Sequence, residues 1–166
     1  MTTSIIFILC EIALLATALV SGIFLAFSDF IMKSLAAANP AGGIESMQII
    51  NRKVFKTIFM TLFMGMAALS PMLIIYAYFQ VSGAAAGWII AGGALYFIGV
   101  FAVTVFFNVP MNKHLALLDF ACSDAEKYWM HTYVPLWTFW NSVRATAAGV
   151  AAVCFLFACI NMAQMP

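Results

Sequence analysis

The last long apolar segment of the chain, "PLWTFWNSVRATAAG" at residues 135–149, contains an asparagine and an arginine. Because an α-helix repeats every 3.6 residues, Trp137, Asn141 and Arg144 share one helical face, and Trp140 flanks it. A guanidinium group, an amide and indole N–H groups are hydrogen-bond donors, and donors fixed in a dry site stabilise an oxyanion that develops during a reaction. These residue types are therefore suited to holding a negatively charged oxygen atom.

Other polar residues should lie at a similar depth. Asp29 follows the first apolar run and is the best carboxylate available to pair with Arg144, while Asn51, Asn108 and Asn112 border the next runs. Proton transfer at such a site would also need a base, for which Asp29 and His114 are the candidates. The sequence thus predicts a catalytic set of Arg144, Asn141, Asp29 and His114, with Asn108, Asn112, Trp137, Trp140 and Asn51 binding the substrate.

The same residues also have a purely structural interpretation. An arginine at the centre of a bilayer costs about 2.5–3.5 kcal/mol on insertion scales, and its long side chain can reach back to the headgroups. Asparagines commonly form hydrogen bonds between membrane helices. On this interpretation the polar residues only hold the helices together.

Motifs for metal, nucleotide and phosphate chemistry are missing from the sequence. The spacing of His114 and His131 matches no metal motif, and the chain has no GxGxxG, P-loop, GxSxG or HExxH pattern. We predict no metal and no cofactor. The net charge of +1 provides no electrostatic reason to expect nucleic acid as a partner.

The elements that must position these residues are membrane helices. The 166 residues are 66% hydrophobic and only 8% charged, against roughly 25% charged residues in soluble domains. Four runs, at about 4–28, 57–79, 84–107 and 136–160, reach the roughly 20 apolar residues that a helix needs to cross a bilayer. The predicted fold is all-α, a polytopic membrane four-helix bundle that forms a single transmembrane domain over residues 1–166.

The basic residues predict how this bundle is oriented. With four spans, all seven Lys and Arg residues fall on one side, and the positive-inside rule makes that side cytoplasmic. We therefore expect an integral protein of the bacterial inner (plasma) membrane, with loops 33–56 and 108–135 in the cytoplasm and both termini on the extracytoplasmic side.

Local signals refine the elements. The pattern Ser123-Asp124-Ala125-Glu126 fits a capping box and predicts a short interfacial helix before the last span. Pro110 is expected to end the regular helix of span three, and a helix that resumes near Ile44 is expected to run unbroken to Phe79. Small residues four apart, Gly22 with Ala26 and Ala148 with Ala152, would also allow close packing of helices within the chain or between the chains of a homo-oligomer.

Four segments of the chain carry a family resemblance: "SGIFLAFSDFIMKSL", "INRKVFK", "FFNVPMNKHLALL" and "WTFWNSVRATAA". With them the chain resembles the DUF1772 or anthrone oxygenase-like family of small four-helix membrane proteins. Lys33 stands where the family pattern has a proline. The resemblance implies a helical bundle and, for some members, oxygenation of anthrones to anthraquinones.

Two functions from different classes remain open. The first is an oxidoreductase, in its simplest form a cofactor-free oxygenase, that acts on a flat, apolar, phenolic or quinone-like molecule arriving from the lipid bilayer. The second is a non-catalytic bundle that binds a lipid or a partner protein and uses its polar residues to fix the helices.

Overall fold

The fold is taken from a computed structural model, which describes residues 5–164. Each span predicted from the sequence corresponds to a helix there, although the second begins at Ile58 and not at Thr57, and residue 4, where the first span was expected to begin, lies outside the described residues. Four continuous helical rods are long and apolar enough to cross a membrane: Ile5–Ala37, Ile58–Gln80, Gly83–Leu117 and Ser123–Ala163. The all-α, four-span architecture is therefore confirmed.

Three of the four rods are not uniform α-helices, because each contains a π-helical segment with a wider turn. The first rod comprises α1 (Ile5–Ala26), η1 (Phe27–Ile31) and α2 (Met32–Ala37). The third comprises α5 (Gly83–Tyr96), η3 (Phe97–Ala102), η4 (Thr104–Asn108) and α6 (Val109–Leu117). The fourth comprises α7 (Ser123–Tyr128), η5 (Trp129–Tyr133) and α8 (Val134–Ala163), while α4 (Ile58–Gln80) is α-helical throughout.

The connection between the first two spans contains α3 (Pro40–Lys53) and a 3-10 turn, η2 (Val54–Lys56). Asn39 caps α3 by accepting a hydrogen bond from the Ala41 N–H, and Pro40 occupies its first turn. The expected unbroken helix to Phe79 is wrong, because Thr57 adopts an extended backbone and its hydroxyl oxygen accepts from the Met60 N–H. Thr57 therefore ends one helical segment and caps α4.

Span three also differs from the expectation. Pro110 does not end the helix, which continues to Leu117. The proline occupies the first turn of α6, directly after the π-helical segment η4, and a residue in a first turn needs no N–H donor. The predicted short helix before the last span is present as α7, but it continues through η5 into α8 without a break.

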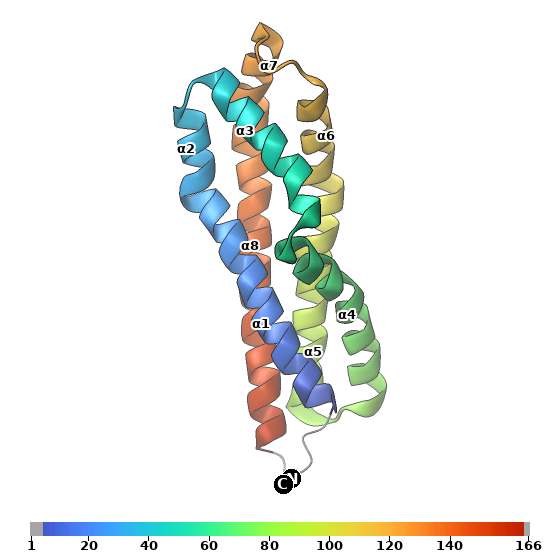
Figure 1. The fold of residues 1–166 in the computed structure, drawn as a ribbon. Coiled ribbons are helices and arrows are strands. Elements are labelled where there is room, and N and C mark those ends of the chain that lie inside the picture. Colours follow the sequence, from blue (N-terminus) through green and yellow to red (C-terminus); the bar gives the residue numbers. More distant parts are fainter. Residues whose placement is uncertain (1–4, 165–166) are drawn as a thin grey trace.

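The rods form a lower and an upper half of the bundle (Figure 1), and each half has its own hydrophobic core. In the lower half, α1, α4, α5 and α8 enclose a core rich in small side chains. In the upper half, α3 crosses the bundle diagonally and packs with α2, α6, α7 and η5 around a second core centred on Trp129, Tyr133 and Met47. Trp137 belongs to the upper core and Phe24 to the lower one, so the two cores meet at this level of α8.

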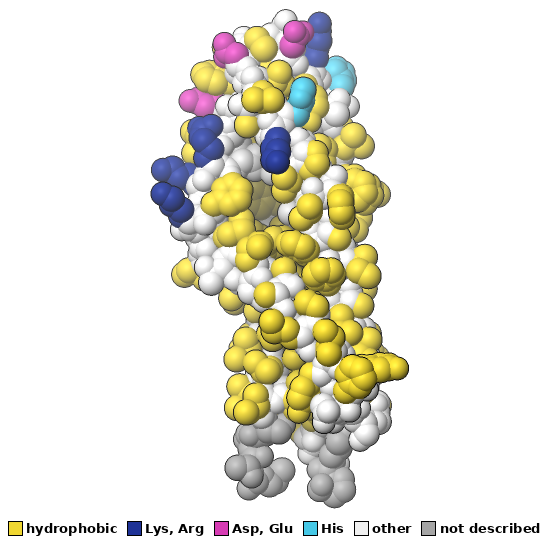
Figure 2. All heavy atoms as spheres, turned by 90° about the vertical axis from the view of Figure 1, so that its right-hand side faces the viewer, with side chains coloured by type: hydrophobic (Ala, Val, Ile, Leu, Met, Phe, Trp, Pro, Cys, Tyr) yellow, Lys and Arg dark blue, Asp and Glu magenta, His cyan; other side chains and the backbone are white. Residues whose placement is uncertain are grey.

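Polar and apolar side chains are segregated along the long axis of the bundle. Figure 2 shows the charged and histidine side chains gathered at one end and apolar side chains over the rest of this face. Large apolar side chains are exposed along the spans, as a helix surface in contact with lipid requires, and examples are Leu15, Ile75, Ile98 and Phe106. The outer surface of the spans is therefore suited to a lipid bilayer.

Candidate functional site

Arg144 is the only charged side chain that is buried within residues 5–164, with an exposed fraction of 4%. Its Nη2 atom donates to Asn141 Oδ1 at 2.7 Å, and its Nη1 atom donates to Thr104 Oγ1 at 3.2 Å. The guanidinium carbon lies 4.2 Å from the ring centre of Phe24 and 5.3 Å from that of Trp137, and both rings attract a cation. Arg144 therefore points into the bundle and does not reach back to the headgroups.

No carboxylate compensates this buried charge. All six Asp and Glu side chains lie within residues 5–164, and all are exposed. The expected pair between Asp29 and Arg144 is wrong, because the Asp29 carboxylate is 71% exposed and lies 3.9 Å from Lys33 Nζ on the same helix. Successive residues of a helix point in different directions, and the neighbouring Ser28 is the residue that faces α8. Arg144 thus carries a buried positive charge with neutral partners only.

Asn141 connects Arg144 to the first span. Its Nδ2 atom donates to the backbone oxygen of Phe24 at 2.6 Å and to Ser28 Oγ at 2.7 Å, while its Oδ1 atom accepts from Arg144. Ser142 Oγ lies 2.9 Å from Ser28 Oγ, within hydrogen-bond distance. The amide of Asn141 is completely buried, so its contacts fix both the position of α1 against α8 and the direction of the guanidinium group.

A second set of hydrogen bonds lies above Arg144 and is centred on Asn112. Asn112 Oδ1 accepts from the Tyr133 hydroxyl at 2.7 Å and from Trp137 Nε1 at 2.9 Å. Asn51 Nδ2 donates to the same Tyr133 hydroxyl at 3.3 Å. The indole N–H of Trp137 is therefore already engaged, and the amide nitrogen of Asn112 is the donor of this group that has no partner within the described chain. Together with Arg144, Asn141, Asn108 and Thr104, these residues form what we call the polar cluster.

Two buried polar atoms of the polar cluster lack a hydrogen-bond partner among the described residues. They are Nε of Arg144, a donor, and Oδ1 of Asn108, an acceptor. Asn108 is 1% exposed and uses its Nδ2 atom to donate to the Trp137 backbone oxygen at 3.2 Å. Buried polar groups in proteins are nearly always paired, so this donor and this acceptor are available to water or to a bound molecule.

The π-helical segments explain how the polar residues come together. Ser28 lies in η1, Thr104 and Asn108 lie in η4, and Tyr133 lies in η5. A π turn inserts an extra residue into a helix and changes which residues face a neighbour, and such turns frequently occur at functional sites. Of the four π-helical segments in residues 5–164, η4 and η5 thus contribute side chains to the polar cluster, and η1 contributes Ser28, which contacts it.

Two residues expected in the site lie outside the cluster. The His114 side chain is exposed, and its ring packs edge-on against Tyr128 at 4.5 Å between ring centres. Trp140 stacks on Phe107 at 3.7 Å, on the side of α8 where Phe107 and Phe139 are exposed. The structure exposes the His114 side chain and leaves the Trp140 side chain half-buried, and neither contacts Arg144.

Sequence reasoning missed Thr104, Tyr133 and Ser28. A regular spacing would have indicated the first two: Thr104, Asn108 and Asn112 follow one another at intervals of four, and Tyr133 precedes Trp137 by four. Ser28 carried no such signal, because its contact with Asn141 depends on the packing of α1 against α8. Within residues 5–164, no three His, Cys, Asp or Glu side chains come together in a way that could hold a metal ion.

The fold and the site define the class: a four-span helical membrane protein with a buried arginine at the junction of two cores. The chain belongs to the anthrone oxygenase family, whose model matches residues 55–154. The matched range includes Thr104, Asn108, Asn112, Tyr133, Trp137, Asn141 and Arg144, and it excludes α1 and α3. No curated protein and no solved structure matches the chain significantly.

Proposed function

We propose that this protein is an anthrone oxygenase-like oxidoreductase, which oxidises a flat, apolar, phenolic or quinone-like molecule at the polar cluster. The observation that carries the proposal is Arg144, a buried guanidinium group with no carboxylate partner and with an unpaired Nε donor. A charge in a low-dielectric environment is costly unless it is paired. A substrate whose oxygen becomes negative during the reaction would provide the missing partner.

The proposed reaction converts a diaryl CH₂ group opposite a carbonyl into a second carbonyl. Loss of one C–H proton to solvent leaves an enolate, whose negative oxygen is stabilised by Arg144. Molecular oxygen then accepts electrons and forms a C–O bond at the former CH₂ carbon, and the resulting peroxide takes up a proton. Loss of the second C–H proton breaks the O–O bond, so that CH₂ and O₂ yield C=O and H₂O. No cofactor is part of this proposal.

The residues of the polar cluster have separate roles in this scheme. Arg144 is directed by Asn141 and Thr104, so its remaining N–H groups are available to the substrate oxygen. Asn112 Nδ2 can donate to a second oxygen, and Asn108 Oδ1 can accept from a substrate hydroxyl. Trp137 and Phe24 provide flat apolar surfaces beside the guanidinium group. Asp29 and His114 lie at the surface, so the scheme assigns the proton to solvent.

The proposal is tested with purified protein in lipid nanodiscs supplied with anthrone under air. Oxygen uptake and quinone absorbance should increase together, with one O₂ consumed per quinone formed. Loss of one oxyanion donor typically lowers kcat by about 10²- to 10³-fold, and we expect Arg144→Met to have an effect of this size. The matched control is Arg52→Met, which removes an exposed arginine and should leave kcat unchanged. Anthrone oxidation at the rate of empty nanodiscs would exclude the activity.

A second candidate function is favoured by the hydrogen bonds that cross from α8 to α1. Asn141 and Ser142 both contact Ser28, and Ser21 Oγ donates to the Ala145 backbone oxygen at 2.9 Å. A non-catalytic bundle that binds a lipid or a partner protein would need these bonds and no substrate. For such a protein, Asn141→Leu and Arg144→Met should reduce the yield of folded protein together, with no turnover of anthrone.

The orientation and assembly of the bundle are also proposals. The Lys and Arg side chains lie towards the end formed by α2, α3, α6 and α7, and we place this end in the cytoplasm of a bacterial cell. Ser82, in the α4–α5 turn, would then face outwards. A membrane-impermeant maleimide should label Ser82→Cys in intact cells and should not label Asn39→Cys. A homo-oligomer is expected to increase the measured mass in nanodiscs to a multiple of the chain mass.

A further inference from the structure

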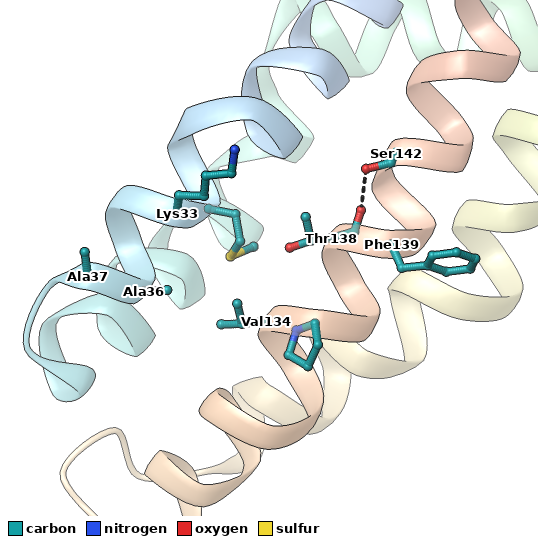
Figure 3. A pocket seen from close by; sticks show the side chains of 9 residues that line it. Lys33, Ala36, Ala37, Val134, Thr138, Phe139 and Ser142 are labelled. Atoms are coloured by element: carbon teal, nitrogen blue, oxygen red, sulfur yellow. Dashed lines mark hydrogen bonds between the residues drawn. The ribbon is translucent and has the colours of Figure 1, made fainter.

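A groove of about 560 Å³ lies between α2 and the beginning of α8 (Figure 3). Its lining is mainly apolar, with Met32 and Ala36 from the first rod and Val134 and Pro135 from the last rod. Lys33, Thr138 and Ser142 form its polar part. Figure 3 shows Val134 and Thr138 pointing from α8 towards α2, while Phe139 points away. The volume falls within the range of roughly 300–1,000 Å³ that is typical of small-molecule sites.

The groove is connected to the polar cluster by hydrogen bonds. Ser142, which lines the groove, lies 2.9 Å from Ser28 Oγ, and Ser28 accepts from Asn141 at 2.7 Å. Asn141 in turn holds Arg144. Only the Ser28–Ser142 contact and the Asn141 amide therefore separate the groove from the buried guanidinium group along this path. The groove itself is an open hollow on the side of the bundle, whereas Arg144 is 4% exposed.

We propose that this groove is the entry site through which an uncharged, flat aromatic ketone or phenol passes from the cytoplasmic edge of the membrane to Arg144. The inference rests on the proposed function and adds a second binding position to it. Entry requires the Ser28–Ser142 contact to open, so these two serines act as a gate between the groove and the polar cluster. Ser28 and Ser142 are positioning residues in this scheme, because they do not touch the reacting atoms.

Three observations favour a neutral aromatic molecule as the occupant. The lining is mainly apolar, and its single cation, Lys33 at the rim, already lies beside Asp29. The hydroxyl oxygen of Thr138 is buried without a hydrogen-bond partner among the described residues, so an oxygen-bearing ligand would relieve a cost that a pure hydrocarbon would leave. The hydrogen bonds through Ser28 also connect the groove to the polar cluster, where the proposed substrate would react.

The test uses benzophenone, a diaryl ketone that inserts into nearby C–H bonds when irradiated. The protein in nanodiscs is irradiated with benzophenone, and the labelled residues are located by peptide mass spectrometry. We expect label on the segments 32–37 and 134–142. Ala36→Phe fills the groove and should reduce this label at least fivefold. Ala68→Phe makes the same substitution at an exposed position of α4, which does not line the groove, and should leave the label unchanged.

A second variant keeps the test valid if Ala36→Phe fails to fold. Thr138→Val preserves the volume and removes the hydroxyl group, so it should weaken benzophenone labelling about threefold to tenfold through one lost hydrogen bond. Label spread evenly over the exposed spans, or concentrated on α4 or α6, would overturn the proposal. The proposal is also overturned if phospholipid acyl chains with photoreactive groups label the groove and excess benzophenone does not displace them.

Turnover measurements separate this proposal from the proposed function. With anthrone as substrate, Ala36→Phe should raise KM at least fivefold and leave kcat within twofold, because it obstructs entry without touching Arg144. Normal KM and kcat in Ala36→Phe, with activity still lost in Arg144→Met, would exclude the entry site and leave the oxygenase intact. Groove labelling without any anthrone oxidation would leave the binding site and exclude the oxygenase.

Discussion

Arg144→Met distinguishes a ligand-binding arginine from one that only holds helices together. The substitution removes two hydrogen bonds, to Asn141 and Thr104, at about 0.6–1.7 kcal/mol each in a membrane bundle. It also removes a cation–π contact worth about 0.5–2 kcal/mol. Against this, it eliminates a buried charge that costs about 2.5–3.5 kcal/mol at the centre of a bilayer. These losses total about 1.7–5.4 kcal/mol, so after the charge is relieved we expect the free energy of unfolding to change by less than about 3 kcal/mol.

Asn141→Leu is the contrasting substitution, because it removes three hydrogen bonds and relieves no charge. It breaks the hydrogen bonds of Asn141 with the Phe24 backbone oxygen, with Ser28 and with Arg144, which should cost about 2–5 kcal/mol in total. Reversible unfolding in detergent, followed by tryptophan fluorescence, measures both variants against the natural chain. Oxygen uptake with anthrone measures function in parallel. If Arg144→Met destabilises the protein by about 3 kcal/mol or more, as Asn141→Leu does, the guanidinium group is a structural element and the reasoning fails.

Three further predictions concern other parts of the bundle. Gln48→Leu should lower the free energy of unfolding by about 1–3 kcal/mol, because Nε2 of this buried glutamine donates to two backbone oxygens at the end of α6, both at 2.9 Å. Chemical denaturation measures this change. An unchanged free energy of unfolding would mean that water replaces the amide, and it would contradict the prediction. Gly43→Ala should cost about 1–3 kcal/mol in the same measurement, since its Cβ would collide with the backbone of α2, whereas Gly22→Ala, with no atom within 4 Å of its Cβ, should be neutral. Asp29→Asn should leave kcat for anthrone within twofold, because this carboxylate is exposed; a tenfold loss would restore it as the base.

The sequence predicts the helices well where the length of an apolar run sets them. It predicts helix ends less well where a single proline or threonine sets them. All four spans follow from runs of about 20 apolar residues, since a backbone in lipid must satisfy its own hydrogen bonds. Pro110 was expected to end a helix, yet a π-helical segment places it in the first turn of α6, where its missing N–H has no cost. Thr57 divides α3 from α4 through its own backbone and hydroxyl group, within a stretch whose composition favours a continuous helix.

Some features of the candidate site follow from the sequence of a single helix, and others depend on how the helices pack. The stripe of Trp137, Asn141 and Arg144 follows from helical periodicity, and the cluster with Asn108 and Asn112 follows from their expected depth. These are local properties of single helices, so the sequence alone determined them. The partners of Arg144 within the cluster depend on how α1 and the third rod rotate against α8.

That rotation was decided only by the tertiary structure. The π-helical segment η1 and the packing of α1 turn Ser28 inwards and leave Asp29 beside Lys33 at the surface. A difference of one residue changes the direction of a side chain by about a quarter of a turn, and no single-helix pattern specifies which neighbour faces the core. By itself the sequence determined a four-span membrane protein with an arginine inside a helix. The packing of three rods made that arginine a buried cation without a counter-charge, because each rod contributed a neutral partner.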